Sequence, residues 1–258
     1  MNPILASRVI ASCPPIAERC TLFSMDSRLI VALDVPSAEP ALALADRLHG
    51  HVRWLKVGLE LYCAEGPSLV RQLCSRGFSV FLDLKLHDIP NTVASAVRSA
   101  AATGAKLLTI HAAGGPAMLR AAAEAAASLP NPPQLLAVTV LTSMDPVQLA
   151  AIGITTTPAD QVQRLAALAA DSGITGLVAS AEEVGVLRRL YPQATLVIPG
   201  IRPAGAAIGD QKRVAAPAAA LAAGASFLVI GRPITQALHP VAATEAILEE
   251  MASVPAMS

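Results

Sequence analysis

The sequence predicts a single-domain α/β protein folded as a (β/α)₈ barrel. Three observations support this prediction: short apolar, β-rich runs alternate with Ala-rich helical stretches, the alternation occurs eight times, and polar residues gather where the apolar runs end. Strands separated by helices form βαβ units with a parallel sheet. Eight copies of one unit favour a closed barrel over an open, doubly wound sheet. The first run is not followed by Gly-x-Gly-x-x-Gly, which disfavours a dinucleotide-binding fold.

The eight expected strands are nearly continuous apolar runs, as is typical of a parallel sheet that is covered on both faces. In chain order they are RLIVALDV (28–35), VRWLKVGL (52–59), FSVFLDLK (78–85), KLLTIHA (106–112), QLLAVTVLT (134–142), GLVAS (176–180), TLVIPGI (195–201) and SFLVIG (226–231).

Each strand is followed by a stretch whose apolar residues recur near i, i+3 and i+4, the spacing of one helix face. Several of these stretches end at Gly, which suits a helix C-terminus. In order they cover residues 41–50, 67–77, 92–104, 117–129, 159–173, 182–190, 210–224 and 241–252.

The first 24 residues stand apart from this pattern. They show no sustained period and contain a Pro-Pro pair. Arg8 and the Pro pair interrupt the apolar run, so we expect no secretory signal. We expect residues 1–24 to form a disordered extension and residues 25–258 to form the barrel and carry the catalytic site.

The composition excludes several classes of function. The chain has 19 basic and 19 acidic residues, and its Arg residues are scattered, so we expect no nucleic-acid binding. Its apolar stretches are shorter than the roughly 18 residues of a membrane span. The four cysteines, at positions 13, 20, 63 and 74, form no Cys-x-x-Cys pair and have no His at metal-ligand spacing. We interpret them as reduced thiols of a cytoplasmic protein.

Polar residues follow or end most of the expected strands. In a barrel the carboxyl ends of all strands converge on one face, where active sites are built. A single polar residue in this position is most simply the ordinary end of a strand. So many of them together predict an active site. The residues are Asp34, Lys56, Asp83, Lys85, His111, Thr142, Ser143, Arg202 and Arg232.

The segment FLDLKLHDIPNT (81–92) carries the densest group of charges. Asp83 and Lys85 are two apart on a strand, so their side chains should share a face. With Asp34, Lys56 and Asp88 they form an array of alternating charge. Carboxylates within about 4–6 Å favour the charged ammonium. This favours proton donation by Lys85 over Schiff-base formation, which needs a neutral amine.

The loop at the end of the same segment should be short and have a restricted backbone conformation. Pro90 holds the residue before it in an extended conformation. We expect Asn91 or Thr92 to cap the following helix. Asp88 should then point away from the centre of its own barrel or toward a neighbour.

Two segments suggest a phosphate site. PGIRPAGAAIGDQKR (199–213) has the length and glycine content of a mobile lid, with Arg202 and Gln211 as its polar tips. In IGRPI (230–234), Gly231 permits close backbone approach and Arg232 offers a bidentate fork. The loops after strands seven and eight are the usual phosphate site of barrels, although Gly-Arg-Pro alone is also a plain structural turn.

The remaining polar residues give weaker evidence about the site. Thr142 and Ser143 suit hydrogen bonding to a planar polar ring, and they suit equally the capping of a helix that starts near Asp145. The five histidines form no metal-ligand set, and we expect no metal site.

Together these segments closely resemble the orotidine 5′-phosphate decarboxylase family of the common bacterial type. The resemblance spans residues 26–250 and rests on ALDV, LKVG, FLDLKLHDIPNT, LTSM, PGIRPAGAAIGDQKRV and IGRPI. The set is specific, but Asp-x-Lys-x-x-Asp alone is shared with sugar-phosphate synthases and decarboxylases of the same superfamily. Ala216 departs from the pattern, in which a Thr is expected before Pro217.

The resemblance implies a homodimer that converts orotidine 5′-monophosphate (OMP) to UMP and carbon dioxide without metal or cofactor. It implies that Lys85 is the proton donor and that Asp83, Lys56 and Asp88 complete the charged network. The implied substrate contacts are Asp34 and Lys56 with the ribose, Thr142 and Ser143 with the pyrimidine, Gln211, Gly231 and Arg232 with the phosphate, Arg202 alongside, and Asp88 and Thr92 reaching into the partner's site.

Two alternatives remain open at this stage. The first is an Mg²⁺-dependent sugar-phosphate enzyme on the same barrel, although such relatives carry an acid where this chain has Lys56. The second is a non-catalytic, phosphate-binding barrel, which would bind UMP without turnover.

Overall fold

The apolar strands of this chain close into one barrel. The computed structural model describes residues 28–203 and 214–254. In it, parallel strands pair in chain order from β1 to β8, and β8 pairs with β1. The strands are β1 (Leu29–Ala32), β2 (Trp54–Gly58), β3 (Ser79–Leu86), β4 (Leu107–His111), β5 (Gln134–Val138), β6 (Gly176–Val178), β7 (Thr195–Ile198) and β8 (Phe227–Ile230). The predicted (β/α)₈ barrel is confirmed.

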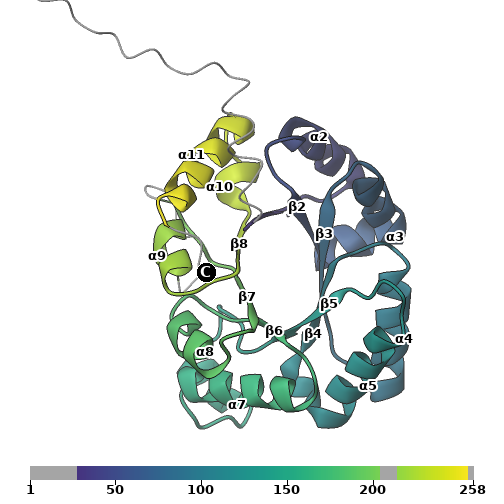
Figure 1. Ribbon diagram of the computed structural model, residues 1–258, viewed down its shortest axis with the longest axis vertical. Coiled ribbons are helices and arrows are strands. Elements are labelled where there is room, and N and C mark those ends of the chain that lie inside the picture. Colours follow the sequence, from purple (N-terminus) through teal and green to yellow (C-terminus); the bar gives the residue numbers. More distant parts are fainter. Residues whose placement is uncertain (1–27, 204–213, 255–258) are drawn as a thin grey trace, which may run out of the picture.

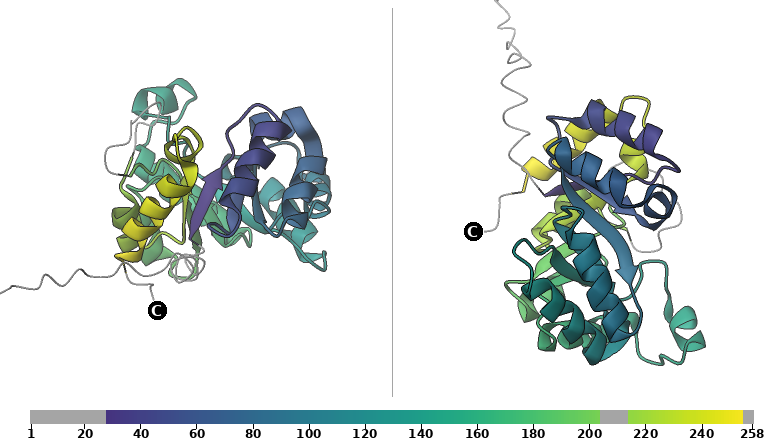
Figure 2. Two further views of the ribbon diagram at one scale, coloured as in Figure 1. Left: turned by 90° about the horizontal axis from the view of Figure 1, so that it is seen from above. Right: turned by 90° about the vertical axis from the view of Figure 1, so that its right-hand side faces the viewer.

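Helices surround the barrel on its outside, as Figure 1 shows. They are α2 (Ala38–Leu48), α3 (Leu59–Ser75), α4 (Pro90–Ala101), α5 (Gly115–Ala127), α6 (Pro146–Ala151), α7 (Pro158–Asp171), α8 (Val184–Leu190), α9 (Pro217–Ala222), α10 (Arg232–Thr235) and α11 (Pro240–Ala252), with a 3₁₀ turn η1 (Ala112–Gly114). The short α6 stands away from this ring (Figure 2). None of the helices in the described part of the chain is long and apolar enough to cross a membrane.

Buried side chains form an outer and an inner core. The outer core lies between strands and helices and holds most of the buried aliphatic residues. The inner core fills the barrel itself and consists of Ile30, Ala32, Phe81, Leu107, Leu136, Val197 and Val229. Trp54 packs edge-on against Phe227 beside this inner core, with ring centroids 5.3 Å apart. The barrel is therefore a packed core that leaves room for a ligand only at an end.

Several strands are shorter than the sequence predicted. β1 ends at Ala32, before Asp34, and β5 ends at Val138, before Thr142. Asp34 and Thr142 therefore lie in the loops that follow these strands, and both line a pocket. The helix expected to start near Asp145 is α6, with Asp145 as its N-cap, whereas the sequence pattern did not predict α10, a short helix in the loop after β8.

The predicted cap of α4 is wrong. The helix begins at Pro90 with Ile89 as its N-cap, so Asn91 and Thr92 lie inside its first turn. Proline is well suited to this first position because it has no N–H group to leave unsatisfied.

Two predictions fall outside the described residues. They are the disordered extension at residues 1–24 and the role of Gln211 together with most of the proposed lid.

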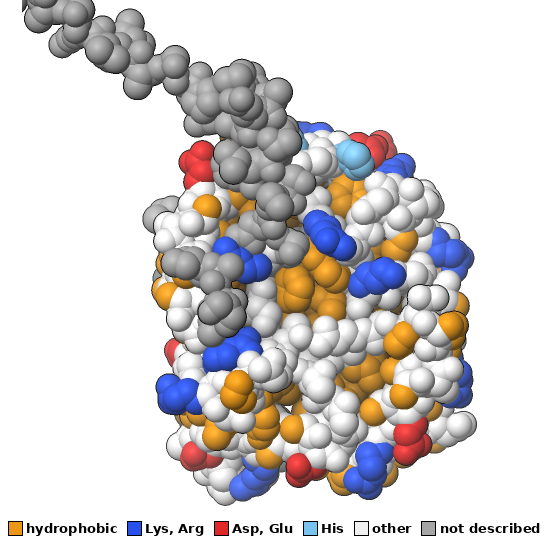
Figure 3. Space-filling model, in the orientation of Figure 1, with side chains coloured by type: hydrophobic (Ala, Val, Ile, Leu, Met, Phe, Trp, Pro, Cys, Tyr) orange, Lys and Arg blue, Asp and Glu red, His pale blue; other side chains and the backbone are white. Residues whose placement is uncertain are grey.

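In Figure 3, charged side chains of both signs are scattered around the rim of one face, with hydrophobic side chains near its centre.

Candidate active site

A pocket of about 300 Å³ opens at the carboxyl ends of the strands. Phe81 of the inner core lines it, so packed hydrophobic side chains lie beneath the polar groups. Nine of the twelve residues predicted for the site line this pocket, which confirms that the strand ends converge. They are Asp34, Lys56, Asp83, Lys85, Thr142, Ser143, Arg202, Gly231 and Arg232.

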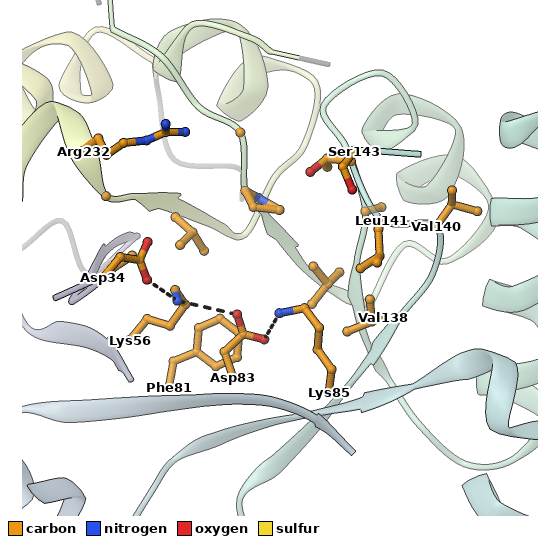
Figure 4. Close-up of a pocket in the computed structure, with 18 of the residues that line it drawn as sticks. Asp34, Lys56, Phe81, Asp83, Lys85, Val138, Val140, Leu141, Ser143 and Arg232 are labelled. Carbon is orange, nitrogen blue, oxygen red and sulfur yellow. Dashed lines mark hydrogen bonds and ion pairs between the residues drawn. The ribbon is translucent and has the colours of Figure 1, made fainter. Parts of the chain in front are cut away.

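Four charged side chains form a row of alternating sign along one side of the pocket, as Figure 4 shows. Lys56 Nζ lies 3.0 Å from Asp34 Oδ1 and 3.7 Å from Asp83 Oδ2. Lys85 Nζ donates a hydrogen bond of 2.8 Å to Asp83 Oδ1. The row Asp34, Lys56, Asp83, Lys85 is thus continuous, with each ammonium next to a carboxylate.

Burial distinguishes the members of this row. The side chain of Lys56 is 9% exposed and that of Asp83 is 14% exposed, whereas Lys85 is 39% exposed. Burial alone would raise the pKa of Asp83. The positive charges of Lys56 and Lys85, with hydrogen bonds from Lys85 and Thr109, outweigh burial and hold the pKa of Asp83 below its ordinary value. Asp83 is therefore a fixed negative charge at neutral pH.

Lys85 reaches the pocket from an irregular part of β3. Its φ is 51°, and among residues 28–203 and 214–254 it is the one non-glycine residue with a positive φ. The register between β3 and β4 shifts here: Leu82 pairs with Leu108, and Leu86 pairs with Ile110. The prediction that Asp83 and Lys85 share a face is confirmed, but a bulge and not plain strand alternation brings the two side chains together.

Thr109 of β4 supports this bulge and is not among the site residues predicted from the sequence. Its hydroxyl accepts a hydrogen bond of 2.8 Å from the backbone N–H of Lys85 and donates one of 3.0 Å to Asp83 Oδ1. The side chain is fully buried. The available signal was a hydroxyl residue inside the otherwise apolar run LLTI, at a position where a strand of this fold expects an aliphatic side chain.

Two glycines make room for the charged row. A Cβ atom on Gly58 would lie 2.8 Å from Lys56 Nζ and 3.5 Å from Asp34 Oδ1. A Cβ on Gly231 would lie 3.1 Å from Asp34 Oδ2. Both glycines therefore provide space at the ends of their strands for the Asp34–Lys56 pair.

The other side of the pocket is polar and carries positive charge. Figure 4 shows Arg232 and Ser143 across the pocket from the charged row. Arg232 is the first residue of α10, directly after Gly231. Arg202 also lines the pocket, and its Nη1 donates to the carbonyl of Ile201 at 2.9 Å. Two guanidinium groups thus lie after β7 and β8, where barrels usually bind phosphate.

Thr142 and Ser143 lie in the loop before α6 but do not cap that helix. The N-cap of α6 is Asp145, which forms a reciprocal capping box with Gln148. Neither Thr142 nor Ser143 is needed as that cap, and both line the pocket.

Asp88 and Thr92 do not lie in the main pocket of their own chain. Both are exposed, and Asp88 Oδ1 accepts a hydrogen bond of 2.6 Å from the backbone N–H of Ile89. They border a second hollow on the other side of Lys85. The side chain of Lys85 therefore lies between its own pocket and an exposed surface that carries Asp88.

Two histidines stack where β3 and β4 end. The rings of His87 and His111 have centroids 5.3 Å apart and are inclined by 22°. Burial, with the nearby charges of His87 and Lys85, lowers the pKa of His111. Within the part of the chain that the structure describes, no three His, Cys, Asp or Glu side chains are grouped as metal ligands.

Comparison with known proteins identifies the family. The profile of the orotidine 5′-phosphate decarboxylase / HUMPS family matches residues 27–247, which include every predicted site residue. The chain belongs to this family. An orotidine 5′-phosphate decarboxylase of Alkalilimnicola ehrlichii is 56% identical over 229 residues, covering 88% of this chain and 97% of the relative. One from Nitrosococcus oceani is 53% identical over 229 residues, covering 88% of this chain and 99% of the relative.

The family also accounts for the fold. A crystal structure of orotidine 5′-phosphate decarboxylase from Lactobacillus acidophilus superposes with a TM-score of 0.77 at 37% sequence identity, covering 88% of this chain and 99% of the other. An uncharacterized conserved protein from Geobacillus kaustophilus gives a TM-score of 0.76, also at 37% identity. The chain thus matches family members over nearly their whole length.

Proposed function

We propose that this chain decarboxylates OMP to UMP and carbon dioxide, the last step of de novo pyrimidine nucleotide synthesis, with Lys85 protonating C6 of the pyrimidine. The observation that carries the proposal is the alternating row Asp34, Lys56, Asp83, Lys85 inside a pocket whose other side holds Arg232. The family relationship, with relatives above 50% identity that are named for this activity, supports the same reaction.

The charged row suits a reaction whose charge moves. Loss of carbon dioxide leaves a carbanion on the ring, and this carbanion needs a proton. A substrate carboxylate about 4 Å from Asp83 is repelled by about 4 kcal/mol at an effective dielectric constant of 20. Once carbon dioxide departs, the carbanion faces the Lys85 ammonium, so attraction replaces repulsion. Fixed charges of this kind stabilise a transition state without having to reorganise.

The phosphate of the substrate would bind far from the reacting carbon. Arg232 and Arg202 supply the positive charge for it at the opposite side of the pocket. Binding energy from a remote group can offset the repulsion at the carboxylate. The truncated substrate orotidine should accordingly lose turnover as well as affinity.

The active form in this proposal is a homodimer in which Asp88 and Thr92 complete the neighbouring site. Their exposure and their position beside Lys85, outside their own pocket, support this arrangement. Ile89, which directly follows Asp88, is 67% exposed and supplies apolar surface for the contact. We place the enzyme in the cytoplasm, consistent with the free thiols of Cys63 and Cys74.

The test is the decrease in OMP absorbance catalysed by the purified chain with and without EDTA. The proposal expects equal, rapid rates in both samples and formation of one UMP per OMP consumed. OMP turnover that EDTA abolishes and Mg²⁺ restores would overturn metal independence. No loss of OMP under any condition would overturn the decarboxylase assignment, and UMP binding in that case would favour the non-catalytic barrel.

A further inference from the structure

The hydroxyl of Thr109 contacts both of the charged residues at which the proposed chemistry occurs. It lies 2.8 Å from the backbone nitrogen of Lys85 and 3.0 Å from Asp83 Oδ1. Thr109 is fully buried and does not line the pocket, so it acts from behind these two residues. The proposed reaction uses the side chains of Lys85 and Asp83 but gives no role to this hydroxyl.

The β3–β4 register explains why a side chain is needed here. Between the pairs Leu82–Leu108 and Leu86–Ile110, three residues of β3 face one residue of β4, which is Thr109. The backbone N–H of Lys85 therefore donates to the Thr109 hydroxyl and not to a strand carbonyl. A buried N–H group without a partner would destabilise this conformation, so the hydroxyl takes the place of a ladder hydrogen bond.

The partners of the Thr109 hydroxyl fix the direction of both of its hydrogen bonds. A hydroxyl has one hydrogen to donate. A backbone N–H can only donate and an ionised carboxylate can only accept, so the hydroxyl accepts from Lys85 and donates its hydrogen to Asp83 Oδ1, which also accepts from Lys85 Nζ. The backbone of Lys85, its ammonium and the carboxylate of Asp83 are thereby tied into one closed set of contacts.

The conformation held in this way is an uncommon one. A φ of 51° at a non-glycine residue is unfavourable and persists when the surroundings enforce it. Relaxation of Lys85 toward the ordinary strand region would rotate its side chain away from Asp83. A displacement of about 1 Å at a reacting group can reduce a rate by roughly a hundredfold.

We propose that Thr109 is a positioning residue that holds the bulge at Lys85 and aligns both Lys85 and Asp83 for proton transfer. The inference rests on the proposed function, because it assigns Lys85 and Asp83 their roles. It predicts that the hydroxyl, and not the shape of the side chain, determines turnover. Valine has the shape of threonine without the hydroxyl, and serine keeps the hydroxyl.

The experiment compares Thr109→Val and Thr109→Ser with the wild-type chain in OMP decarboxylation. Thr109→Val should lower kcat by roughly ten- to a hundredfold, while the affinity for UMP changes little because the phosphate contacts are remote. Thr109→Ser should recover most of the wild-type kcat. The acid limb of the kcat profile should also move to higher pH in Thr109→Val, because Asp83 loses a hydrogen bond that favours its charged form.

A matched control removes a buried threonine hydroxyl elsewhere. Thr244 in α11 is fully buried and donates to the carbonyl of Pro240 at 2.8 Å. Thr244→Val should lower the thermal midpoint but leave kcat and its pH profile unchanged. If Thr109→Val does not fold, Thr109→Cys, whose thiol is a weaker hydrogen-bonding group, replaces it, and the same fall in kcat is expected.

The outcomes separate this inference from the proposed function. If the wild-type chain does not decarboxylate OMP, the proposed function fails. If the wild-type chain is active but folded Thr109→Val, or Thr109→Cys in its place, matches it in kcat and pH profile, only the positioning role fails. A fall in kcat that Thr109→Ser does not recover also overturns the role of the hydroxyl.

Discussion

Gly58 and Lys56 are in such close proximity that a Cβ atom on Gly58 would lie 2.8 Å from Lys56 Nζ. The atom that must give way is the end of a flexible side chain, so Gly58→Ala should fold. Its Lys56 ammonium should nevertheless shift away from Asp34. We expect a fall in kcat/KM for OMP of roughly tenfold or more.

The control for Gly58→Ala is Gly185→Ala. A Cβ on Gly185 in α8 would approach only Arg189, at 3.8 Å, so this variant should keep wild-type kinetics. Steady-state kinetics and thermal unfolding of both variants provide the comparison. Wild-type kinetics in Gly58→Ala would show that the position of Lys56 has no effect on the reaction.

Lys85→Ala should remove the proton donor. Electrostatic and general-acid effects at one group account for factors of about 10² to 10⁴ each. We therefore expect turnover to fall by many orders of magnitude while UMP affinity stays within a few-fold. Lys106→Ala, which changes an exposed lysine just before β4, is the matched control. Near-normal decarboxylation by Lys85→Ala would refute the assignment of the acid.

Mixing two inactive variants tests the shared site. Asp88→Ala and Lys85→Ala subunits should each be nearly inactive alone. In a mixed dimer, one site combines an intact Lys85 with an intact Asp88 from the other subunit. Activity should therefore reappear after the two variants are mixed under conditions that permit subunit exchange. Exchange is checked by native mass spectrometry, and mixed dimers without activity would remove Asp88 from the neighbouring site.

Replacement of Asp83 by Asn tests the repulsion directly. Asp83→Asn removes the negative charge that faces the substrate carboxylate but keeps a side chain of the same shape. We expect kcat to fall by at least about a hundredfold. We also expect KM for OMP to fall, because loss of ground-state repulsion lowers both constants. A raised KM with unchanged kcat would show that Asp83 only binds substrate.

Site residues are predictable from the sequence where one residue type at a strand end is enough. Asp34, Lys56 and Arg232 follow or end apolar runs, and barrel topology brings such ends together whatever the details of pairing. Residues whose role depends on pairing between strands are not predictable in this way. The role of Thr109 depends on a register shift between β3 and β4, and a register is a property of two segments that neither segment carries alone. The cap of α4 was mispredicted because Pro90 can itself begin a helix.

The stacked pair His87 and His111 provides a prediction for stability. The pKa of His111 is lowered below its ordinary value of 6.5 in the folded state. The unfolded chain therefore takes up a proton near pH 6.5 while folded His111 stays neutral, so this group makes the fold less stable as the pH falls below 6.5 and has no such effect above it. His111→Asn, which retains an acceptor for the N–H of Ala113, should lose less stability between pH 7.5 and 5.5 than the wild-type chain does. Urea midpoints at the two pH values measure this change, with exposed His239→Asn as the control. The interpretation would be wrong if His111→Asn showed the same pH dependence as the wild-type chain and His239→Asn.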